Sequence, residues 1–318
     1  MAARGFCLDA SLVDWLLEES NPSVRYFALR WLLDRSEDDP EVAAASQAID
    51  QSAAVQGILR KQRPAGYWGR DARPHQGTRG HLHMLMWLGY RGDAAIRKAV
   101  DYHIAGCLRE DGAYVVEVKD RSILLPCHGA ELLREMLWFG YESDPRARKL
   151  LDWLVRTQGA TGVWPCLSKR RPFVCQWATA GALRAYADLP VEWLTPEVQA
   201  SRQRAVEFFL NARVFRFGRG KPEPRWLQFG FPLQWDSDVL EVLELLSPYV
   251  RADDERMQQA LRLVLDKQDG QGRWPCEKHP KGGKWMLEYM TSERVGEPSK
   301  WVTLHALRML RTMGKVQG

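Results

Sequence analysis

The chain has 318 residues, enough for one large domain or two small ones, and its 45% hydrophobic content supports a sizeable core. The net charge of +5 is modest for this length, so we expect no nucleic-acid partner. No apolar run is long enough to span a membrane, and residues 1–9 lack the apolar stretch of a signal peptide. We therefore expect a cytoplasmic protein without a transmembrane segment, whose only membrane contact would be peripheral.

Two kinds of helical segment alternate along the chain. Segments with apolar residues on one face cover roughly 10–19, 40–61, 92–108, 145–157, 196–213 and 253–267. Segments that are apolar on nearly all sides cover roughly 22–34, 78–89, 126–140, 173–188, 235–247 and 299–312. Asp39, Asp144 and Thr195 each precede a proline, which predicts an N-cap followed by proline at the first helical position.

A short motif repeats through the chain. Gln, a Gly four residues later and a Trp two residues after that occur at 62–68, 158–164 and 268–274, with a degenerate copy at 108–114. A further copy has decayed to a remnant at 214–226. The repeat-turn tryptophans Trp68, Trp164 and Trp274 are expected to be structural. Each repeat therefore predicts a helix, a glycine-aromatic turn and a second helix.

This repeat resembles that of the squalene-cyclase and protein-prenyltransferase family, over nearly the whole chain. The resemblance implies an (α/α)6 toroid with an aromatic-lined pocket at the N-terminal ends of the inner helices. Six one-faced and six apolar segments fit six outer and six inner helices, although an open superhelix has the same alternation. No Pro-rich or Ser/Gly-rich linker divides the chain. We expect an all-α fold, with residues 1–318 forming a single toroid domain.

Each expected inner helix carries one tryptophan, and these side chains are candidates for substrate binding. Aromatic faces stabilise a cation and suit a polyene chain, although tryptophan also fills core space well. Trp177, Trp235 and Trp301 lie near helix starts and are the better pocket candidates. Trp87 is a further candidate. His81, at the start of the segment 78–89, is a further candidate for lining the cavity.

Asp236 and Asp238 lie in the sequence Trp-Asp-Ser-Asp-Val at the expected start of the fifth inner helix. The segment resembles the D-x-D-D motif of proton-initiated cyclases, which implies that Asp238 is the proton donor, although Val239 replaces the last acid. Burial against aromatics favours a neutral acid, whereas a helix N-terminus favours the carboxylate. The alternative is structural, with Asp236 capping the helix and Asp238 in its first turn. The D-x-C zinc motif of protein prenyltransferases is not reproduced, because Asp238 replaces its cysteine.

Cysteine and histidine residues near two inner-helix starts form a candidate zinc site. Six cysteines in a chain without a secretion signal indicate free thiols or ligands rather than disulfides. Cys127 and His128 open the third inner helix, Cys175 opens the fourth, and Cys166 lies in the loop between them. Together they could form a Cys3His shell, although buried cysteine is often a small hydrophobe. Cys-His-Gly at this place resembles lanthionine synthetase cyclases, another zinc-dependent toroid family, with the order of ligands reversed.

Basic residues gather where the repeat has decayed, at positions 213, 216, 219, 221 and 225. They could clamp an isoprenoid diphosphate, but a solvated charged loop is the better interpretation. A lid over the cavity is a third interpretation of this insertion.

Three hypotheses for function follow. The one we favour is a terpenoid cyclase-like enzyme acting on a hydrophobic isoprenoid, with Asp238 as the acid. The alternative enzyme is a zinc-dependent, thiol-activating transferase or cyclase using Cys127, His128, Cys166 and Cys175. The third hypothesis is a non-catalytic toroid that binds a lipid or a protein.

Overall fold

A computed structural model describes residues 9–69, 77–118, 121–166, 173–218, 220–233, 236–279, 284–289 and 293–316. The chain divides into two compact units, which are described separately. The first unit comprises Met1–Arg60, Trp87–Tyr90 and Leu210–Gly318, and the second comprises Lys61–Met86 and Arg91–Phe209.

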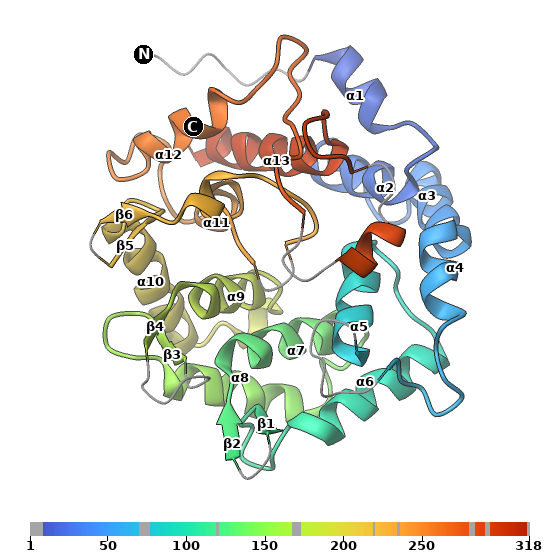
Figure 1. Ribbon diagram of the computed structural model, residues 1–318, viewed down its shortest axis with the longest axis vertical. Coiled ribbons are helices and arrows are strands. Elements are labelled where there is room, and N and C mark those ends of the chain that lie inside the picture. Colours follow the sequence, from blue (N-terminus) through green and yellow to red (C-terminus); the bar gives the residue numbers. More distant parts are fainter. Residues whose placement is uncertain are drawn as a thin grey trace. The chain divides into compact units, whose positions relative to one another are not determined.

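The first unit contains seven of the helices in the described part of the chain (Figure 1). They are α1 (Ala10–Leu16), α2 (Pro22–Trp31), α3 (Pro40–Gln51), α4 (Ala53–Leu59), α11 (Val239–Leu246), α12 (Gln258–Leu265) and α13 (Lys300–Val316). Short elements join them: the strands β5 (Arg216–Phe217) and β6 (Lys221–Pro222), and the 3-10 turns η2 (Pro224–Leu227) and η3 (Lys284–Glu288).

The second unit holds the middle of the chain. Its helices are α5 (Thr78–Trp87), whose last residue belongs to the first unit, α6 (Ala94–Cys107), α7 (Pro126–Trp138), α8 (Pro145–Thr157), α9 (Gln176–Ala187) and α10 (Pro196–Asn211), which ends in the first unit. The remaining elements are β1 (Val115–Val118), β2 (Arg121–Leu124), β3 (Trp164–Cys166), β4 (Phe173–Cys175) and the 3-10 turn η1 (Val191–Trp193).

Helix starts follow the capping residues that the sequence offers. The Asp39 carboxylate accepts the backbone N–H of Glu41 at 2.8 Å, and Asp144 caps α8 in the same way. The expected helix over 40–61 is interrupted, because Ser52 is extended and its hydroxyl accepts the N–H of Val55 at 3.3 Å. This residue therefore ends α3 and caps α4.

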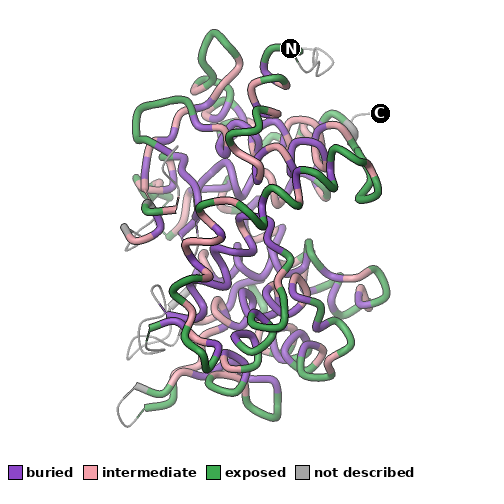
Figure 2. The backbone as a smooth tube through the Cα atoms, turned by 90° about the vertical axis from the view of Figure 1, so that its right-hand side faces the viewer, coloured by how far each residue is buried: buried purple, intermediate pink, exposed green. Residues whose placement is uncertain are grey.

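Figure 2 colours the backbone by burial, and buried and exposed stretches alternate along it. In α11 six of eight residues are buried, whereas α12 buries one face, formed by Ala260, Leu261 and Val264. Within the first unit the apolar helix α13 packs against α2 and α11, and the one-faced helices α3 and α12 pack on α2 and α11. Within the second unit, α7 packs against α9, α6 and α8. The alternation in the sequence thus corresponds to a core layer and a covering layer inside each unit.

The glycine of the repeat allows the turn to contact the next covering helix. Gly162 has a φ of +85°, and a Cβ there would lie 2.1 Å from the carbonyl oxygen of Arg204. The Gln158 side chain donates to the carbonyls of Gly162 at 3.0 Å and Ser201 at 2.9 Å. The indole of Trp164 is fully buried and donates to the Leu154 carbonyl at 2.8 Å. The repeat therefore packs its turn against the next helix. The burial of its tryptophans confirms the structural role expected for them.

Three antiparallel hairpins, each of two strands, depart from the all-α expectation. They are β1–β2, β3–β4 and β5–β6. The pair β3–β4 aligns Trp164 with Cys175, so Cys166 is on a strand rather than in a loop, and α9 begins only at Gln176. Short strands carry little periodicity, and for that reason the sequence did not show them.

The described part of the chain is thus mostly helical, with thirteen α-helices close to the expected segments. None of these helices is both long and apolar enough to cross a membrane. The ring of six inner and six outer helices, the single domain and the cytoplasmic location stay predictions.

Candidate functional site

Asp238 is the N-cap of α11, and its carboxylate accepts the backbone N–H of Glu241 at 2.9 Å. The structural alternative in the sequence analysis placed Asp236 at the cap and Asp238 inside the first turn, and this assignment is wrong. The Asp236 carboxylate instead accepts the guanidinium N–H of Arg225 at 2.6 Å. The helix therefore starts at Val239, later than the expected 235.

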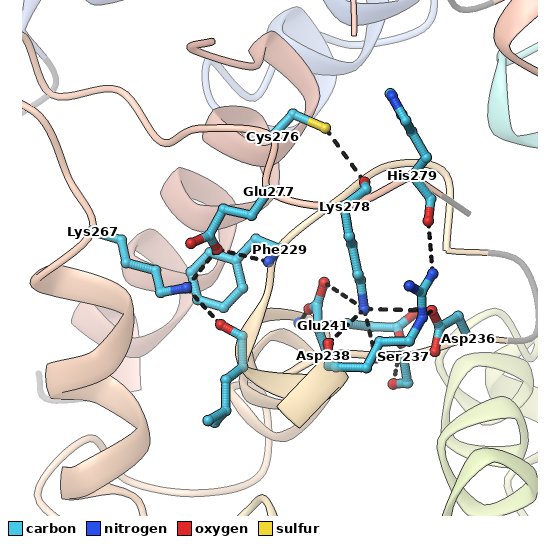
Figure 3. Close-up of polar contacts among 12 residues, drawn as sticks. Phe229, Asp236, Ser237, Asp238, Glu241, Lys267, Cys276, Glu277, Lys278 and His279 are labelled. Carbon is cyan, nitrogen blue, oxygen red and sulfur yellow. Dashed lines mark hydrogen bonds and ion pairs between the residues drawn. The ribbon is translucent and has the colours of Figure 1, made fainter. Parts of the chain in front are cut away.

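Lys278 binds the two aspartates from a segment 40 residues further along the chain (Figure 3). Its ammonium lies 3.6 Å from Asp236 Oδ2 and 3.8 Å from Asp238 Oδ2. It also donates to the backbone carbonyls of Ser237 at 3.0 Å and Arg225 at 3.2 Å. The ammonium is thus held by main-chain oxygens and shared between two carboxylates. The Lys278 ammonium therefore keeps hydrogen-bond and ion-pair partners when one of the two carboxylates takes up a proton.

The Asp238 cluster consists of Arg225, Asp236, Asp238, Glu241 and Lys278. Its three acids and its lysine are buried, and Asp238 is only 1% exposed. Three carboxyl groups face two cations, so the cluster is neutral only when one carboxyl keeps its proton. Burial raises the pKa of Asp238 to about 7; the Lys278 charge opposes this rise, and the neighbouring acids add to it. About half of the Asp238 carboxyls therefore hold a proton at neutral pH, and more do so below it.

The basic residues between 213 and 225 divide into separate roles. Arg225 is not part of a solvated loop, because it forms the close ion pair with Asp236. Arg216 donates to the Gln259 side chain at 3.1 Å and to the Gly220 carbonyl at 3.2 Å, which closes the β5–β6 hairpin. Position 219 lies outside the described residues. No diphosphate clamp is needed to account for Arg216 and Arg225.

A cluster of aromatic rings lies in the same unit as the Asp238 cluster. Phe231 stacks on Trp301 with centroids 4.0 Å apart, and Trp87 meets the edge of Phe231 at 5.1 Å. Phe27 lies 5.9 Å from Trp301. His305 joins the cluster, 5.7 Å from Phe231. Two of the expected substrate-binding residues, Trp87 and Trp301, are thus brought together by the fold.

Two buried groups, Cys276 and Glu293, contact the main chain of residues in the aromatic cluster. The Phe231 amide donates a hydrogen bond to the Cys276 sulfur. This sulfur also lies 3.5 Å from the Lys278 carbonyl oxygen. Burial raises the pKa of this thiol to about 11. The Glu293 carboxyl accepts from the Ser299 hydroxyl and the Trp301 amide, and burial raises the pKa of Glu293 to about 7. The segment 276–278 therefore contacts the acids through Lys278 and the main chain of Phe231 through Cys276.

The Glu244 side chain on α11 contacts two residues of α13 beside the aromatic cluster. His305 Nδ1 lies 2.8 Å from Glu244 Oε2, and Arg308 donates to the other oxygen at 3.1 Å. Burial would raise the pKa of Glu244, but His305 and Arg308 outweigh it, so the pKa of Glu244 is lowered. The Glu244 carboxyl therefore fixes the His305 ring beside Trp301 and Phe231.

The remaining substrate-binding candidates have different positions. Trp235 lies outside the described residues, and Trp177 is half-buried in the first turn of α9, in the second unit. His81 stacks on the repeat-turn ring of Trp68, with centroids 5.2 Å apart, and its Nδ1 is 2.9 Å from the Gly77 carbonyl oxygen. Burial lowers the pKa of His81 to about 4, so the imidazole is neutral. These contacts make His81 part of the repeat packing.

The candidate zinc ligands are all in the second unit. Cys127 and His128 occupy the first turn of α7 and are half-buried, and Cys175 is the buried N-cap of α9. The His128 ring meets the Tyr114 ring edge-on at 5.7 Å. Among the residues whose side chains are described, no group of three His, Cys, Asp or Glu is arranged to hold a metal; Cys166 lies outside this set. The Cys3His shell therefore stays a prediction.

Sequence reasoning missed several members of the site. Glu241 and Glu244 could have been found, because acids inside an apolar helix need partners. Lys278 and Glu293 gave no signal, since nothing in their local sequence shows that they are buried.

No protein-family model and no curated protein sequence matches the chain. Its structure is similar to that of a variant of the type II terpene cyclase MstE from Scytonema, solved with geranylgeranyl dihydroxybenzoate as substrate. The identity is 16%, the match covers 96% of this chain and 99% of that chain, and the TM-score is 0.46. A protein from Actinoplanes matches at 16% identity over 92% and 90% of the chains, with a TM-score of 0.46. A possible GH105-family member from Salmonella enterica matches at 9% identity over 97% and 77% of the chains, with a TM-score of 0.39.

Proposed function

We propose that this chain is a terpenoid cyclase-like enzyme with the (α/α)6 toroid architecture, in which Asp238 starts cyclisation by protonating an isoprenoid substrate. The observation that carries the proposal is the buried Asp238 carboxyl, whose pKa of about 7 leaves it largely protonated below neutral pH. An ordinary surface carboxyl is ionised there and has no proton to give.

The proposed chemistry uses the groups around Asp238 in sequence. Asp238 transfers its proton to one carbon of a terminal double bond, and the other carbon becomes a cation that the next double bond attacks. The Lys278 ammonium, 3.8 Å away, stabilises the carboxylate left behind. Loss of a proton from the cyclised cation forms a new double bond, so the product is an isomer of the substrate.

The aromatic cluster is the proposed place for the hydrocarbon and its cation. Phe231 and Trp301 are buried and stack face to face, and the half-buried Trp87 beside them would offer negative ring potential and an apolar surface. Trp177 and Trp235 remain proposed pocket residues. The arrangement favours a hydrophobic isoprenoid over a polar substrate, because the described side chains near Trp301 are largely aromatic or aliphatic.

The experiment measures cyclisation directly. The purified chain is incubated in deuterated buffer with polyprenyl arenes such as geranylgeranyl dihydroxybenzoate, the substrate named for MstE, and with polyprenyl diphosphates. We expect a cyclised isomer carrying one deuterium, and a rate reduced at least about a hundredfold in Asp238→Asn, as for loss of a general acid. The exposed acid Asp266 supplies the matched control, Asp266→Asn, which should retain the activity. Cyclisation that is unchanged in Asp238→Asn, or no cyclised product from any of these substrates, would overturn the proposal.

A further inference from the structure

One buried nitrogen beside the aromatic cluster has no hydrogen-bond partner among the described residues. His305 Nδ1 lies 2.8 Å from Glu244 Oε2, whereas His305 Nε2 is shielded from solvent and is bonded by none of these residues. Buried polar atoms in proteins are nearly always hydrogen-bonded, because a buried polar atom without a partner is destabilising. An unused nitrogen next to the proposed place of the hydrocarbon therefore points to a chemical role for His305.

The Glu244 carboxylate determines which nitrogen of His305 carries the hydrogen. Burial opposes the ionisation of Glu244, but His305 and Arg308 outweigh it and lower the pKa of this carboxyl. Arg308 donates to the second oxygen of Glu244 at 3.1 Å. An ionised carboxylate can only accept, so His305 Nδ1 carries the hydrogen of its contact with Glu244. In the neutral imidazole the lone pair is then on Nε2, which is the arrangement of a general base held by a carboxylate.

Aromatic rings lie around the His305 ring. Its centroid is 5.6 Å from the ring of Trp31, 5.7 Å from that of Phe231 and 6.0 Å from that of Trp87. Trp31 and Trp87 are half-buried, so a hydrocarbon can contact the cluster at these two rings. Aromatic faces that stabilise a carbocation also stabilise an imidazolium. The neighbouring Glu244 carboxylate adds an opposite charge, which favours the form of His305 that has taken up a proton.

We propose that His305 is the general base that ends the cyclisation, an inference that rests on the proposed function. Glu244 is the residue that positions His305. In the terminating step, a C–H bond next to the cationic carbon breaks, and its electron pair forms the new double bond. The proton goes to His305 Nε2, and the imidazolium later releases it to solvent. Asp238 supplies one proton and His305 removes another, so the product stays an isomer of the substrate.

The test compares the products of wild type and His305→Asn in the cyclisation assay described above. The Asn amide keeps an N–H close to the position of Nδ1 but has no counterpart of Nε2. Asp238 still starts the reaction in this variant, and the cation is trapped by water as an alcohol or loses a different proton. We expect substrate consumption within about tenfold of wild type, and a fall of at least about tenfold in the ratio of the wild-type alkene to the other products.

His103→Asn is the matched control, because His103 has the same contact on one side of its ring and a partner on the other. His103 Nδ1 lies 2.8 Å from Glu135 Oε2, and His103 Nε2 lies 3.0 Å from the Tyr114 hydroxyl oxygen. This variant should keep the wild-type product pattern. Glu244→Gln removes the charge that holds His305 and should shift the products in the same direction as His305→Asn, but less. If His305→Asn does not fold by circular dichroism, Glu244→Gln decides the question.

The possible outcomes separate the two proposals. A wild type that forms no cyclised product would overturn both of them. A wild type that cyclises, with an unchanged product pattern in folded His305→Asn or an equal shift in His103→Asn, would overturn the role of His305 alone. A folded His305→Asn that consumes no substrate would also overturn this role alone, because a terminating base acts only after the cation has formed.

Discussion

Replacing Asp238 with Asn should change how the stability of the protein depends on pH. The folded pKa of about 7 exceeds the ordinary value of 3.8 because the buried carboxylate is poorly solvated. The folded state therefore binds the proton more tightly than the unfolded state, and stability falls as pH rises from 3.8 through 7 and is level above it. Over this whole range the loss is about 4 kcal/mol, at about 1.4 kcal/mol per pH unit. Asn can still cap α11 through its side-chain oxygen, so the cap is retained.

The assay is urea unfolding of wild type and Asp238→Asn at about pH 5 and about pH 8. Subtracting the two proteins cancels other groups that titrate in this range, including Glu293. The variant should gain stability relative to wild type by roughly 2–3 kcal/mol between the two pH values. Asp266→Asn, at an exposed position, should show no such gain. A difference between wild type and Asp238→Asn that is independent of pH would refute the reasoning that Asp238 is protonated in the folded protein.

Three further predictions concern packing, buried charge and metal. Gly162→Ala should lose more than about 2 kcal/mol in urea unfolding, because its Cβ would meet the Arg204 carbonyl at 2.1 Å. Gly270→Ala, with open space around it, should change little. Glu131→Gln should cost about 3–5 kcal/mol, since it leaves the buried Arg184, which bonds Glu131 at 2.5 Å, without that charge; a loss below 1 kcal/mol would contradict this. If the alternative Cys3His site holds zinc, mass spectrometry should find about one zinc per chain, lost in the Cys127→Ala, Cys175→Ala double variant; metal-free wild type would reject the zinc site.

Most of the fold's local features could be predicted from the sequence, because they depend on neighbouring residues. Apolar periodicity located the helices, and Asp39 and Asp144 marked two helix starts. The repeat glycines marked turns, since their positive φ angles suit glycine. The break at Ser52 was missed because a capping serine inside an apolar pattern cannot be distinguished from an ordinary surface serine of a helix.

The candidate site was only partly predictable. The sequence indicated Asp238 as an acid at a helix start and Trp87 and Trp301 as aromatic candidates. It did not indicate which of Asp236 and Asp238 caps the helix, because the two side chains are identical and have the same capping chemistry. The structure stacks His81, a candidate for lining the cavity, on Trp68, and a histidine on an apolar face gives no sign of which ring it meets.

The sequence by itself determined which segments are helical and where the glycine turns fall, because backbone preferences and capping act over a few residues. The tertiary structure decided the chemistry of Asp238. It placed Lys278 against both aspartates and Arg225 against Asp236, and it buried the two aspartates and Lys278. Desolvation and the balance of nearby charges set the proton affinity of a carboxyl, and both arise only when separate parts of the chain meet.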